Sequence, residues 1–254
     1  MIDIQQLCLS FDGITPTLQD IDLQVKANEF VAIVGPSGCG KTTLLNLCAG
    51  LVACPTGQHI RVNGQAPSLG DHQVAYMLAR DSLLPWASAL DNASFGLKVR
   101  GVPTAQARDK ALAMLKRVGL DGFEHNLPKA LSHGMRQRVA LARTFAMDSP
   151  LLLMDEPFGA LDAQTKLHLQ DLLLQLCQDS PRAVMFVTHD LSEAVSLADR
   201  VIIMSSRPGR IIANLEVPLP RPRSIRELQT NDAFHHTYRE VWRHLESGWE
   251  HHEG

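Results

Sequence analysis

The sequence contains no apolar run of the roughly 18 to 20 residues that a helix needs to cross a bilayer. It also begins without the positively charged segment of a secretory signal, because Asp3 stands where basic residues are expected. The five cysteines form no C-x-x-C pair and are odd in number, which argues against both a disulfide framework and a zinc site. We therefore expect a protein of the reducing cytoplasm whose contact with any membrane is peripheral.

An excess of basic residues is missing as well. The formal net charge of −3 gives no sign of the clustered positive charge that nucleic-acid binding favours, so no nucleic-acid partner is expected. The 254 residues are 45% hydrophobic and 20% charged, which is typical of a soluble globular protein. A chain of this length suits one large α/β domain, or a core with a small inserted subdomain.

Several segments have the composition of strands. Continuous apolar runs predict strands buried on both faces at 30–35, 151–156 and 183–189. The first thirty residues instead alternate apolar with polar residues, which predicts an antiparallel pattern with one solvated face. Shorter strands are expected at 60–64, 73–77 and 200–204.

Helical patterns fall between these strands. Helices are expected to begin near Lys41 and Asp162, and another to run over 135–147. Thr104 is expected to cap a further helix, with Gly119 as its stop. Strands that alternate with helices predict a mainly parallel sheet with helices on both faces.

The helical segment at about 80–145 interrupts this alternation and is predicted to be an insertion. Apolar residues at helical spacing near the end of the chain predict a helix that packs onto the body: Phe234, Tyr238, Trp242 and Leu245. We assign a single domain to 1–245 and expect a flexible tail at 246–254.

The chemistry begins with GPSGCGKT at 35–42, which matches the phosphate-loop pattern G-x-x-x-x-G-K-[ST] between a predicted strand and a predicted helix. Backbone N–H groups and the helix N-terminus can cradle phosphates there. Lys41 is expected to reach the β- and γ-phosphates of a nucleotide, and the Thr42 hydroxyl to bind Mg²⁺. A glycine-rich turn that matches by chance is the alternative. The expected nucleotide-binding residues are Gly35, Pro36, Ser37, Gly38, Cys39, Gly40, Lys41, Thr42 and Thr43.

Two carboxylates and a histidine extend this prediction. Asp155 ends the run LLLMDE, where its carboxylate can hold the metal or a metal-bound water. Glu156 follows and, in a continuing strand, points the other way, so it can polarise a water for attack on the γ-phosphate. His189 ends the next buried run and can contact the γ-phosphate or that water. The alternatives are an ordinary acidic pair at a strand end and a core histidine.

With these motifs in order, the chain resembles the ATP-binding subunit of an ATP-binding-cassette (ABC) transporter over almost its whole length. The motifs that carry the resemblance are GPSGCGKTT (35–43), LSHGMRQR (131–138), LLLMDEP (151–157), FGALD (158–162) and VTHD (187–190). Within the family it looks most similar to the nitrate, sulfonate and taurine import group, through SLLPW (82–86), Met135, RPGRI (207–211) and PLPRPR (218–223).

The resemblance implies a P-loop NTPase core of α/β class, with an N-terminal antiparallel β subdomain and an inserted helical subdomain. It implies ATP and Mg²⁺ as ligands and a second ATP-binding subunit as partner, in a homodimer or a heterodimer. It also implies integral membrane permease subunits, indirectly a solute-binding protein, and a peripheral position at the cytoplasmic face of the membrane. The cargo is not readable because it never touches this chain.

The resemblance also assigns residues beyond the phosphate loop. Ser132, His133, Gly134 and Met135 form the signature loop, which faces the phosphate loop of the partner cassette. Phe11 fits the aromatic position that stacks on adenine, although it can equally be a core aromatic. Asp162 is assigned to the dimer interface, with helix capping as the alternative.

Two positions depart from the family pattern. His133 replaces a glycine, which adds bulk at a close contact and narrows the accessible backbone angles. Histidine enters the left-handed region more often than most residues, so the loop need not be disrupted. Ala79 stands where the family places a glutamine that meets Mg²⁺ and the attacking water. These departures lead us to expect slow ATP hydrolysis, or work beside a more complete partner cassette.

Other features leave alternatives open. Cys39 lies near Lys41, where its pKa could fall, or it is a small filler. Residues 83–86 are either core or a docking surface for a permease helix. The tail histidines are expected to be solvated. Competing functions are a regulatory cassette that barely hydrolyses ATP, a soluble cassette acting on ribosomes or DNA, and a small-molecule kinase. The signature loop and the Asp-Glu pair argue against the kinase.

Overall fold

The computed structural model describes residues 1–79, 81–159 and 161–250, and within them six strands form the central sheet in the order β5–β6–β7–β3–β8–β9. Neighbours from β5 to β8 are parallel, and β9 is antiparallel to β8. The bounds are β3 Phe30–Val34, β5 Val74–Met77, β6 Leu151–Asp155, β7 Ala183–Val187, β8 Arg200–Met204 and β9 Ile211–Glu216. The mainly parallel sheet is therefore confirmed, whereas β9 was not predicted.

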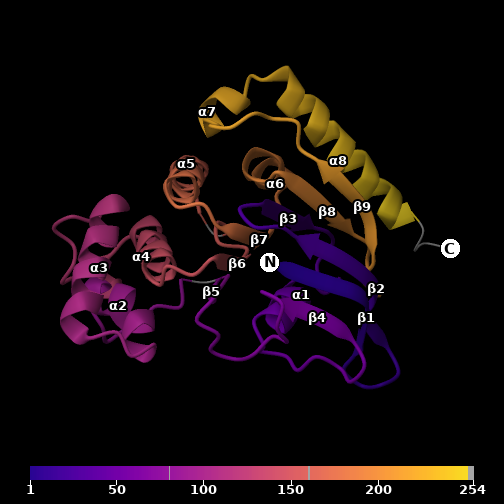
Figure 1. The fold of residues 1–254 in the computed structure, drawn as a ribbon. Helices are drawn as coiled ribbons and strands as arrows, with labels where there is room; N and C mark the ends of the chain where they lie inside the picture. The colour runs from indigo at the N-terminus through magenta and orange to yellow at the C-terminus, as the bar shows by residue number, and fades with distance from the viewer. Residues whose placement is uncertain (80, 160, 251–254) are drawn as a thin grey trace.

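A second, antiparallel sheet lies beside the first at the N-terminal part of the chain (Figure 1). Its order is β2–β1–β4, with bounds β1 Ile2–Ser10, β2 Pro16–Val25 and β4 His59–Val62. The alternating residues of β1 and β2 bury one face, as the sequence predicts.

The central strands are apolar throughout because both of their faces are covered. In β3, Phe30, Ala32 and Val34 belong to the hydrophobic core on one face, while Val31 and Ile33 pack into a second core on the other. Alternate residues of a strand point to opposite faces, so only a continuous apolar run fills both cores. The helices that flank the sheet are α1 Lys41–Cys48, α5 Ala163–Asp179 and α6 Leu191–Leu197.

A separate group of helices forms the inserted lobe (Figure 1). It comprises α2 Ala89–Val99, α3 Thr104–Arg117 and α4 His133–Ala146, with the short 3-10 turn Pro128–Ala130. The sequence missed α2 as a separate element, and Thr104 is the first residue of α3, so it does not cap that helix: Pro103 occupies the cap position. Gly119, at φ 72°, follows the helix end as expected.

The C-terminal part contains α7 Ile225–Leu228 and α8 Asp232–Glu250, and α8 packs against α6 and β8. Of the predicted stripe, Phe234 and Leu245 are buried and Tyr238 packs against the core, whereas Trp242 is 41% exposed. The stripe therefore packs onto the body in part. The expected tail from residue 246 stays a prediction, because α8 continues to Glu250 and 251–254 lie outside the described residues. Among the described helices, none combines the length and apolar character that a bilayer crossing needs.

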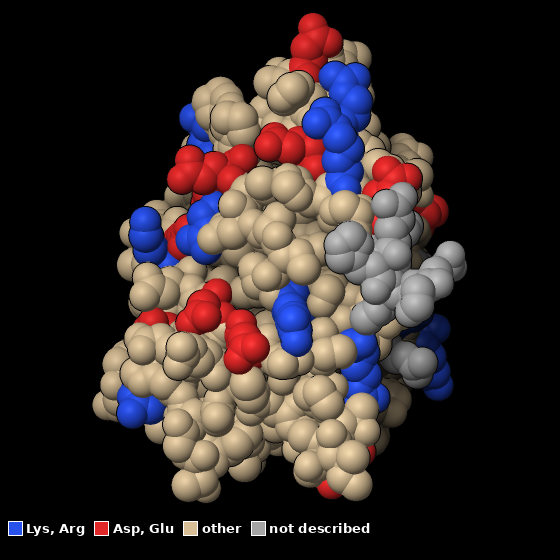
Figure 2. Space-filling model, turned by 90° about the vertical axis from the view of Figure 1, so that its right-hand side faces the viewer, with Lys and Arg blue, Asp and Glu red and all other residues tan. Residues whose placement is uncertain are grey.

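The molecular face on the side of β9 and the end of α8 mixes charges of both signs (Figure 2). Lysine and arginine side chains lie among aspartate and glutamate side chains there, with neutral surface between them. This mixture agrees with the small net charge of the chain.

Candidate nucleotide-binding site

The predicted phosphate loop and the predicted catalytic residues meet at the carboxyl ends of three adjacent strands. The loop follows β3, Asp155 ends β6, and His189 comes two residues after β7. Since the order in the sheet is β6–β7–β3, parallel pairing brings these three ends to one edge. Ligands of open α/β sheets bind in the crevice outside this edge.

Gly40 lets the chain turn from the loop into α1. It is the N-cap residue of α1 and has φ 102°, a left-handed value that favours glycine. A Cβ atom there would also lie 2.6 Å from Cδ2 of Leu18. The glycine therefore permits both the turn and the close contact with β2, and it aims the N-terminus of α1 into the site.

Lys41 is held inside the loop. Its side-chain Nζ donates hydrogen bonds to the backbone oxygens of Gly35 and Pro36, each at 2.8 Å, and the residue is only 6% exposed. Hydrogen bonds from an ionised donor are about twice as strong as neutral ones. The ammonium group thus keeps the loop in its turned shape, and a bound phosphate would compete with these two carbonyls for it.

Thr42 and Asp155 bring two oxygen donors together. The Thr42 hydroxyl donates a hydrogen bond of 3.1 Å to Oδ1 of Asp155. Burial raises the pKa of Asp155, and the bond from Thr42 offsets part of that effect. Hydroxyl and carboxylate oxygens are the donors that Mg²⁺ prefers, and a nearly buried carboxylate is suited to a cation. The residues present therefore fit Mg²⁺.

Glu156 adopts a conformation that the sequence does not predict. The strand ends at Asp155, and Glu156 turns the chain at φ 44°, so it does not continue the strand as expected. Left-handed backbone is uncommon for residues other than glycine and concentrates at functional sites. Oε2 of Glu156 lies 3.2 Å from Nδ1 of His189. The turn therefore joins the two predicted catalytic side chains.

A cavity of about 220 Å³ lies between the loop and Glu156. Its lining residues are Ser37, Gly38, Gly40, Lys41, Thr42, Thr43 and Glu156. Gly35 and Pro36 contribute backbone oxygens to Lys41 and do not line it. Phe11, at the end of β1, is 64% exposed and lies outside the lining, so its adenine contact stays a prediction.

Cys39 faces the core. Its side chain is fully buried among apolar residues of β2, β3 and α1, and that burial raises the pKa of the thiol against a smaller opposing effect of Lys41. Of the two interpretations of Cys39, a lowered pKa is contradicted, because removal from water disfavours the thiolate more than the ammonium group of Lys41 favours it. The alternative interpretation as a small filler agrees with this position.

The signature segment starts a helix of the inserted lobe. Ser132 is the N-cap of α4, and its side chain accepts a hydrogen bond from the backbone N–H of Met135 at 3.2 Å. His133 is the first helical residue and its φ is not in the left-handed region, so the expected backbone conflict does not arise. Ser132 and His133 are exposed and line no part of the phosphate cavity. Within one chain, the signature residues are not brought to the phosphate loop.

Asp162 caps α5, because its side chain accepts a hydrogen bond of 3.0 Å from the backbone N–H of Thr165. That bond also lowers the pKa of Asp162. Capping therefore holds within the chain, and the interface role stays a prediction. Ala79 is exposed in the segment after β5.

The segment 83–88, which precedes α2, has a defined shape. Asn92, fully buried on α2, donates hydrogen bonds of 3.0 to 3.1 Å to the backbone oxygens of Leu84, Ala87 and Ser88. It also accepts one of 2.7 Å from the backbone N–H of Leu84. Leu83 packs against the core while Trp86 is 76% exposed, so the cluster at 83–86 is part core and part surface.

Sequence reasoning also missed a glycine behind the loop. Gly209 donates its N–H to the Thr17 carbonyl at 2.9 Å, and any side chain at Gly209 would overlap the carbonyl oxygen of Cys39. The segment RPGRI therefore supports the phosphate loop from its outer side. The glycine was visible in the segment RPGRI, but the sequence does not show which part of the backbone a glycine approaches.

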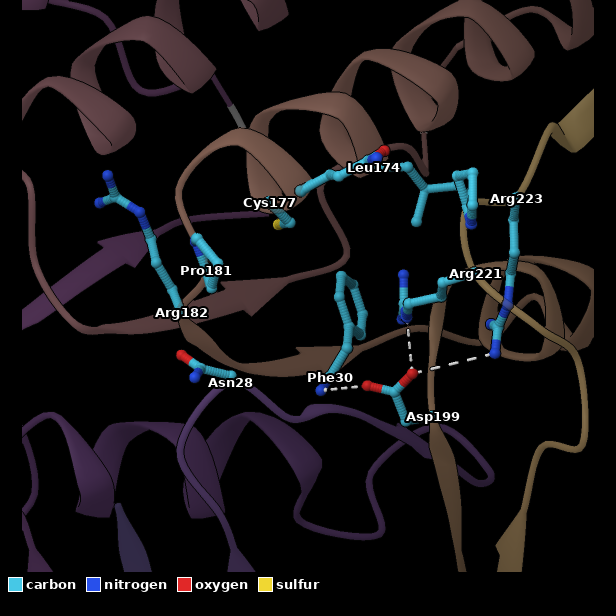
Figure 3. A pocket seen from close by; sticks show the side chains of 11 residues that line it. Asn28, Phe30, Leu174, Cys177, Pro181, Arg182, Asp199, Arg221 and Arg223 are labelled. Carbon is cyan, nitrogen blue, oxygen red and sulfur yellow. Dashed lines mark hydrogen bonds and ion pairs between the residues drawn. The ribbon is translucent and has the colours of Figure 1, made fainter.

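A further cavity of about 330 Å³ lies at the opposite, amino edge of the sheet (Figure 3). There Asp199 accepts hydrogen bonds from the backbone N–H of Phe30 at 2.9 Å and from Nε of Arg221 at 2.7 Å. Arg223 lies 3.8 Å from the same carboxylate and donates to the carbonyls of Ala198 and Leu219, and burial lowers its pKa to about 10. The arginines of PLPRPR therefore fasten the C-terminal segment to the sheet.

A glycine-rich loop between a buried strand and a helix, with a carboxylate at a neighbouring strand end, defines a P-loop nucleoside-triphosphate-binding domain. Residues 18–159 match the family model described as ABC transporter. The chain is 43% identical over 221 residues to the taurine import ATP-binding protein TauB of Yersinia pestis, which covers 85% of this chain and 84% of that protein.

Solved structures agree with this match. A dimeric structure of the bacterial ABC transporter cassette MJ0796 has a TM-score of 0.75 and 29% identity, and covers 87% of this chain and all of that one. The same cassette in a post-hydrolysis state with ADP and Pi gives a TM-score of 0.74 with 28% identity, at the same coverage. The chain belongs to the ABC transporter family and, as one of its ATP-binding subunits, is an ATPase.

Proposed function

We propose that this chain is the ATPase subunit of an importer for a small solute of the taurine, sulfonate or nitrate class. It acts as a dimer of cassettes at the cytoplasmic face of integral membrane permease subunits that receive solute from a solute-binding protein. The observation that carries the proposal is the meeting of Lys41, Asp155, Glu156 and His189 at one edge of the sheet in a chain 43% identical to a taurine import ATPase.

The chain's own residues divide the chemistry among them. Lys41 and the N-terminus of α1 bind the β- and γ-phosphates, while Thr42 and Asp155 hold Mg²⁺, which neutralises phosphate charge when bound. Glu156 accepts a proton from the water that attacks the γ-phosphorus, and the bond to the ADP oxygen breaks, which releases ADP and phosphate. His189, 3.2 Å from Glu156, orients that carboxylate.

The second cassette completes the site. Ser132 and the exposed N-terminus of α4 carry hydrogen-bond donors that have no phosphate to meet within their own chain. Placed against the phosphate loop of a partner, they would contact the γ-phosphate. This arrangement explains why the signature residues are exposed, and Asp162 at the start of α5 would lie in the same interface.

A groove between the core and the inserted lobe supports permease docking. It has a volume of about 340 Å³, and its walls come from the end of α1, the segment before β5 and α2. Leu51, Leu69, Phe95 and Val99 in its walls are 46% to 74% exposed, which is unusual for large apolar residues. An amphipathic helix of a membrane subunit would bury these side chains.

A slow, regulatory cassette is the second candidate. Ala79 carries a methyl group where the family has a metal-contacting amide, and His133 adds an imidazole at the interface. The intact set of Lys41, Asp155, Glu156 and His189 favours turnover. Turnover compared with MgATP affinity in the purified chain separates the two: tight binding with almost no phosphate release supports the regulatory cassette.

Reconstitution tests the transport role. The chain is co-expressed with tagged permease subunits, purified with them, and placed in vesicles with the cognate solute-binding protein. ATP-dependent uptake of taurine, an alkanesulfonate and nitrate is then compared. Failure of the chain to co-purify with any permease contradicts the importer role, and uptake of none of the three solutes contradicts the solute class.

A further inference from the structure

Lys166 sits in the first turn of α5 and bridges to the helix that follows His189. Its Nζ lies 3.0 Å from Oδ2 of Asp190 and 3.0 Å from Oε1 of Glu193. The lysine side chain is flexible and strongly hydrated, so contact with two carboxylates at once restricts it to one conformation. The side chain therefore connects α5 to α6 at a defined point.

Glu193 makes this bridge more than a surface ion pair. Its side chain is 2% exposed, and burial raises its pKa while Thr188 and Lys166 act in the opposite direction. A buried carboxylate needs a charge partner and hydrogen bonds, and removing one partner leaves an uncompensated charge. Lys166 supplies that charge.

The same carboxylate holds one neighbour of His189 directly and the other through it. The Thr188 hydroxyl donates a 2.6 Å hydrogen bond to Oε2 of Glu193, and it accepts one of 3.0 Å from the backbone N–H of Asp190. Residues 188 and 190 are thus fixed on either side of His189, whose imidazole itself is exposed. The position of His189 relative to Glu156 depends on this frame.

The other end of the bridge meets the signature helix. A Cβ atom on Gly134 would lie 2.7 Å from Cγ2 of Thr165, so the N-terminal turn of α4 packs directly on the first turn of α5. Thr165 is bonded through its backbone N–H to Asp162. A continuous set of contacts therefore runs from Gly134 through Thr165 and Lys166 to the segment that carries His189.

We propose that Lys166 is a positioning residue that couples the partner-facing starts of α4 and α5 to His189 and, through it, to Glu156. This inference rests on the proposed dimeric ATPase, in which those helix starts meet the nucleotide of the other cassette. Closure of the interface moves α5, and Lys166 transmits that movement to the catalytic pair. The two nucleotide sites of the dimer are thereby linked through each chain.

Turnover of Lys166→Met tests the coupling. We expect kcat to fall roughly 10- to 100-fold, the effect of a small misplacement of a catalytic group, while MgATP affinity changes less than about threefold. Lys166→Arg keeps the charge and should recover most of the rate. Lys116→Met, an exposed lysine on α3, is the matched control and should match the wild type.

A second variant separates positioning from loss of fold. In the double variant Lys166→Met/Glu193→Gln no buried charge is left unpaired, so the melting temperature should recover while kcat stays low. A folded Lys166→Met or double variant with a wild-type kcat overturns the proposal, and so does loss of MgATP affinity in proportion to kcat.

Amide hydrogen exchange provides a readout that does not need turnover. In Lys166→Met, exchange at residues 188–190 should be faster than in the wild type and in Lys116→Met. Unchanged exchange overturns the positioning role, whatever the ATPase rate. A wild type that fails to hydrolyse ATP, combined with faster exchange in the variant, instead counts against the proposed function alone.

Discussion

The phosphate-loop region and the signature region differ in how much of a site one chain builds. Around the loop, Lys41 is 6% exposed and bonded to the loop's carbonyls, and Thr42 already touches Asp155. Around the signature, Ser132 and His133 are exposed and, in the described part of the chain, do not line the phosphate cavity. The first region is preorganised by the fold, whereas the second, under our proposal, would become a site only against a partner cassette.

The attachments of the two regions differ as well. The strands under the phosphate loop are buried on both faces, which fixes the loop through apolar packing. The inserted lobe is also joined to the segment before α2 by polar contacts: Arg136 pairs with the Asp81 carboxylate at 2.8 Å, and Arg143 donates to the backbone oxygens of Asp81 and Ser82. Apolar residues of the lobe also belong to the hydrophobic core on one face of the central sheet, so polar and apolar contacts together hold the lobe in place.

The largest effect is expected at Lys41. Lys41→Ala removes the charge that meets phosphate and the two bonds that shape the loop, so MgATP affinity should fall by about 2 to 5 kcal/mol, roughly 30-fold or more. Calorimetric titration with MgATP measures it, with Lys110→Ala on α3 as the control. Full affinity together with ATP-dependent dimerisation in Lys41→Ala would refute the nucleotide site itself.

Glu156 comes next. Glu156→Gln keeps the size of the side chain but cannot accept a proton, so kcat should fall about 10²- to 10⁴-fold with little change in MgATP affinity. Single-turnover phosphate release measures the chemical step. A rate within threefold of the wild type would show that another group serves as the base.

The docking groove can be tested without touching the nucleotide. Phe95→Asp/Val99→Asp puts charge into an apolar interface, at a cost of several kcal/mol, so co-purification with co-expressed permease subunits should be lost. The ATPase rate of the isolated chain should not change. Ile212→Asp, a change at an exposed apolar residue on β9, is the control and should keep permease binding. Permease binding that survives in the groove variant would contradict the assignment.

The two departures from the family pattern should have a smaller effect. Ala79→Gln/His133→Gly restores the family residues, and if they limit turnover, kcat should rise by up to about tenfold, or about 1.4 kcal/mol. The two single variants show which region is responsible, because the family pattern assigns Ala79 to the chain's own nucleotide site and His133 to the interface with a partner cassette. An unchanged rate in all three variants would rule out both departures as the limit.

The smallest effect concerns stability. Folding raises the pKa of Asp155 above its ordinary value of 3.8, so the ionised carboxylate destabilises the nucleotide-free fold at neutral pH. Asp155→Asn still accepts the Thr42 bond and should raise the melting temperature by roughly 2 to 4 °C, the shift that about 1 kcal/mol gives. The difference should shrink as pH falls through the folded pKa and vanish below about 3.8. A lower melting temperature at pH 7 would contradict this sign.

Much of the core could be predicted because its signals are local. The runs at 30–35 and 151–156 are apolar since both faces of their strands are covered, and the phosphate-loop pattern needs its strand and helix on either side. Two elements were not predicted from the sequence. The buried Asn92 of α2 hydrogen-bonds to the loop before that helix. The residues of β9 are only half-buried against β8. Both are held by contacts with other elements, α2 with α3 and α4, and β9 with β8.

The sequence by itself determined the mainly parallel sheet, the phosphate loop and the place of Asp155, Glu156 and His189 at or just after strand ends. These features are local, because the order of residues along a strand or loop decides which side chain follows it. Tertiary structure alone decided the left-handed turn at Glu156, the high pKa of Cys39 and the bridge from Lys166 to Glu193. These features depend on burial and on contacts between segments distant along the chain. Desolvation and charge pairing act through space, so no local pattern of residues carries them.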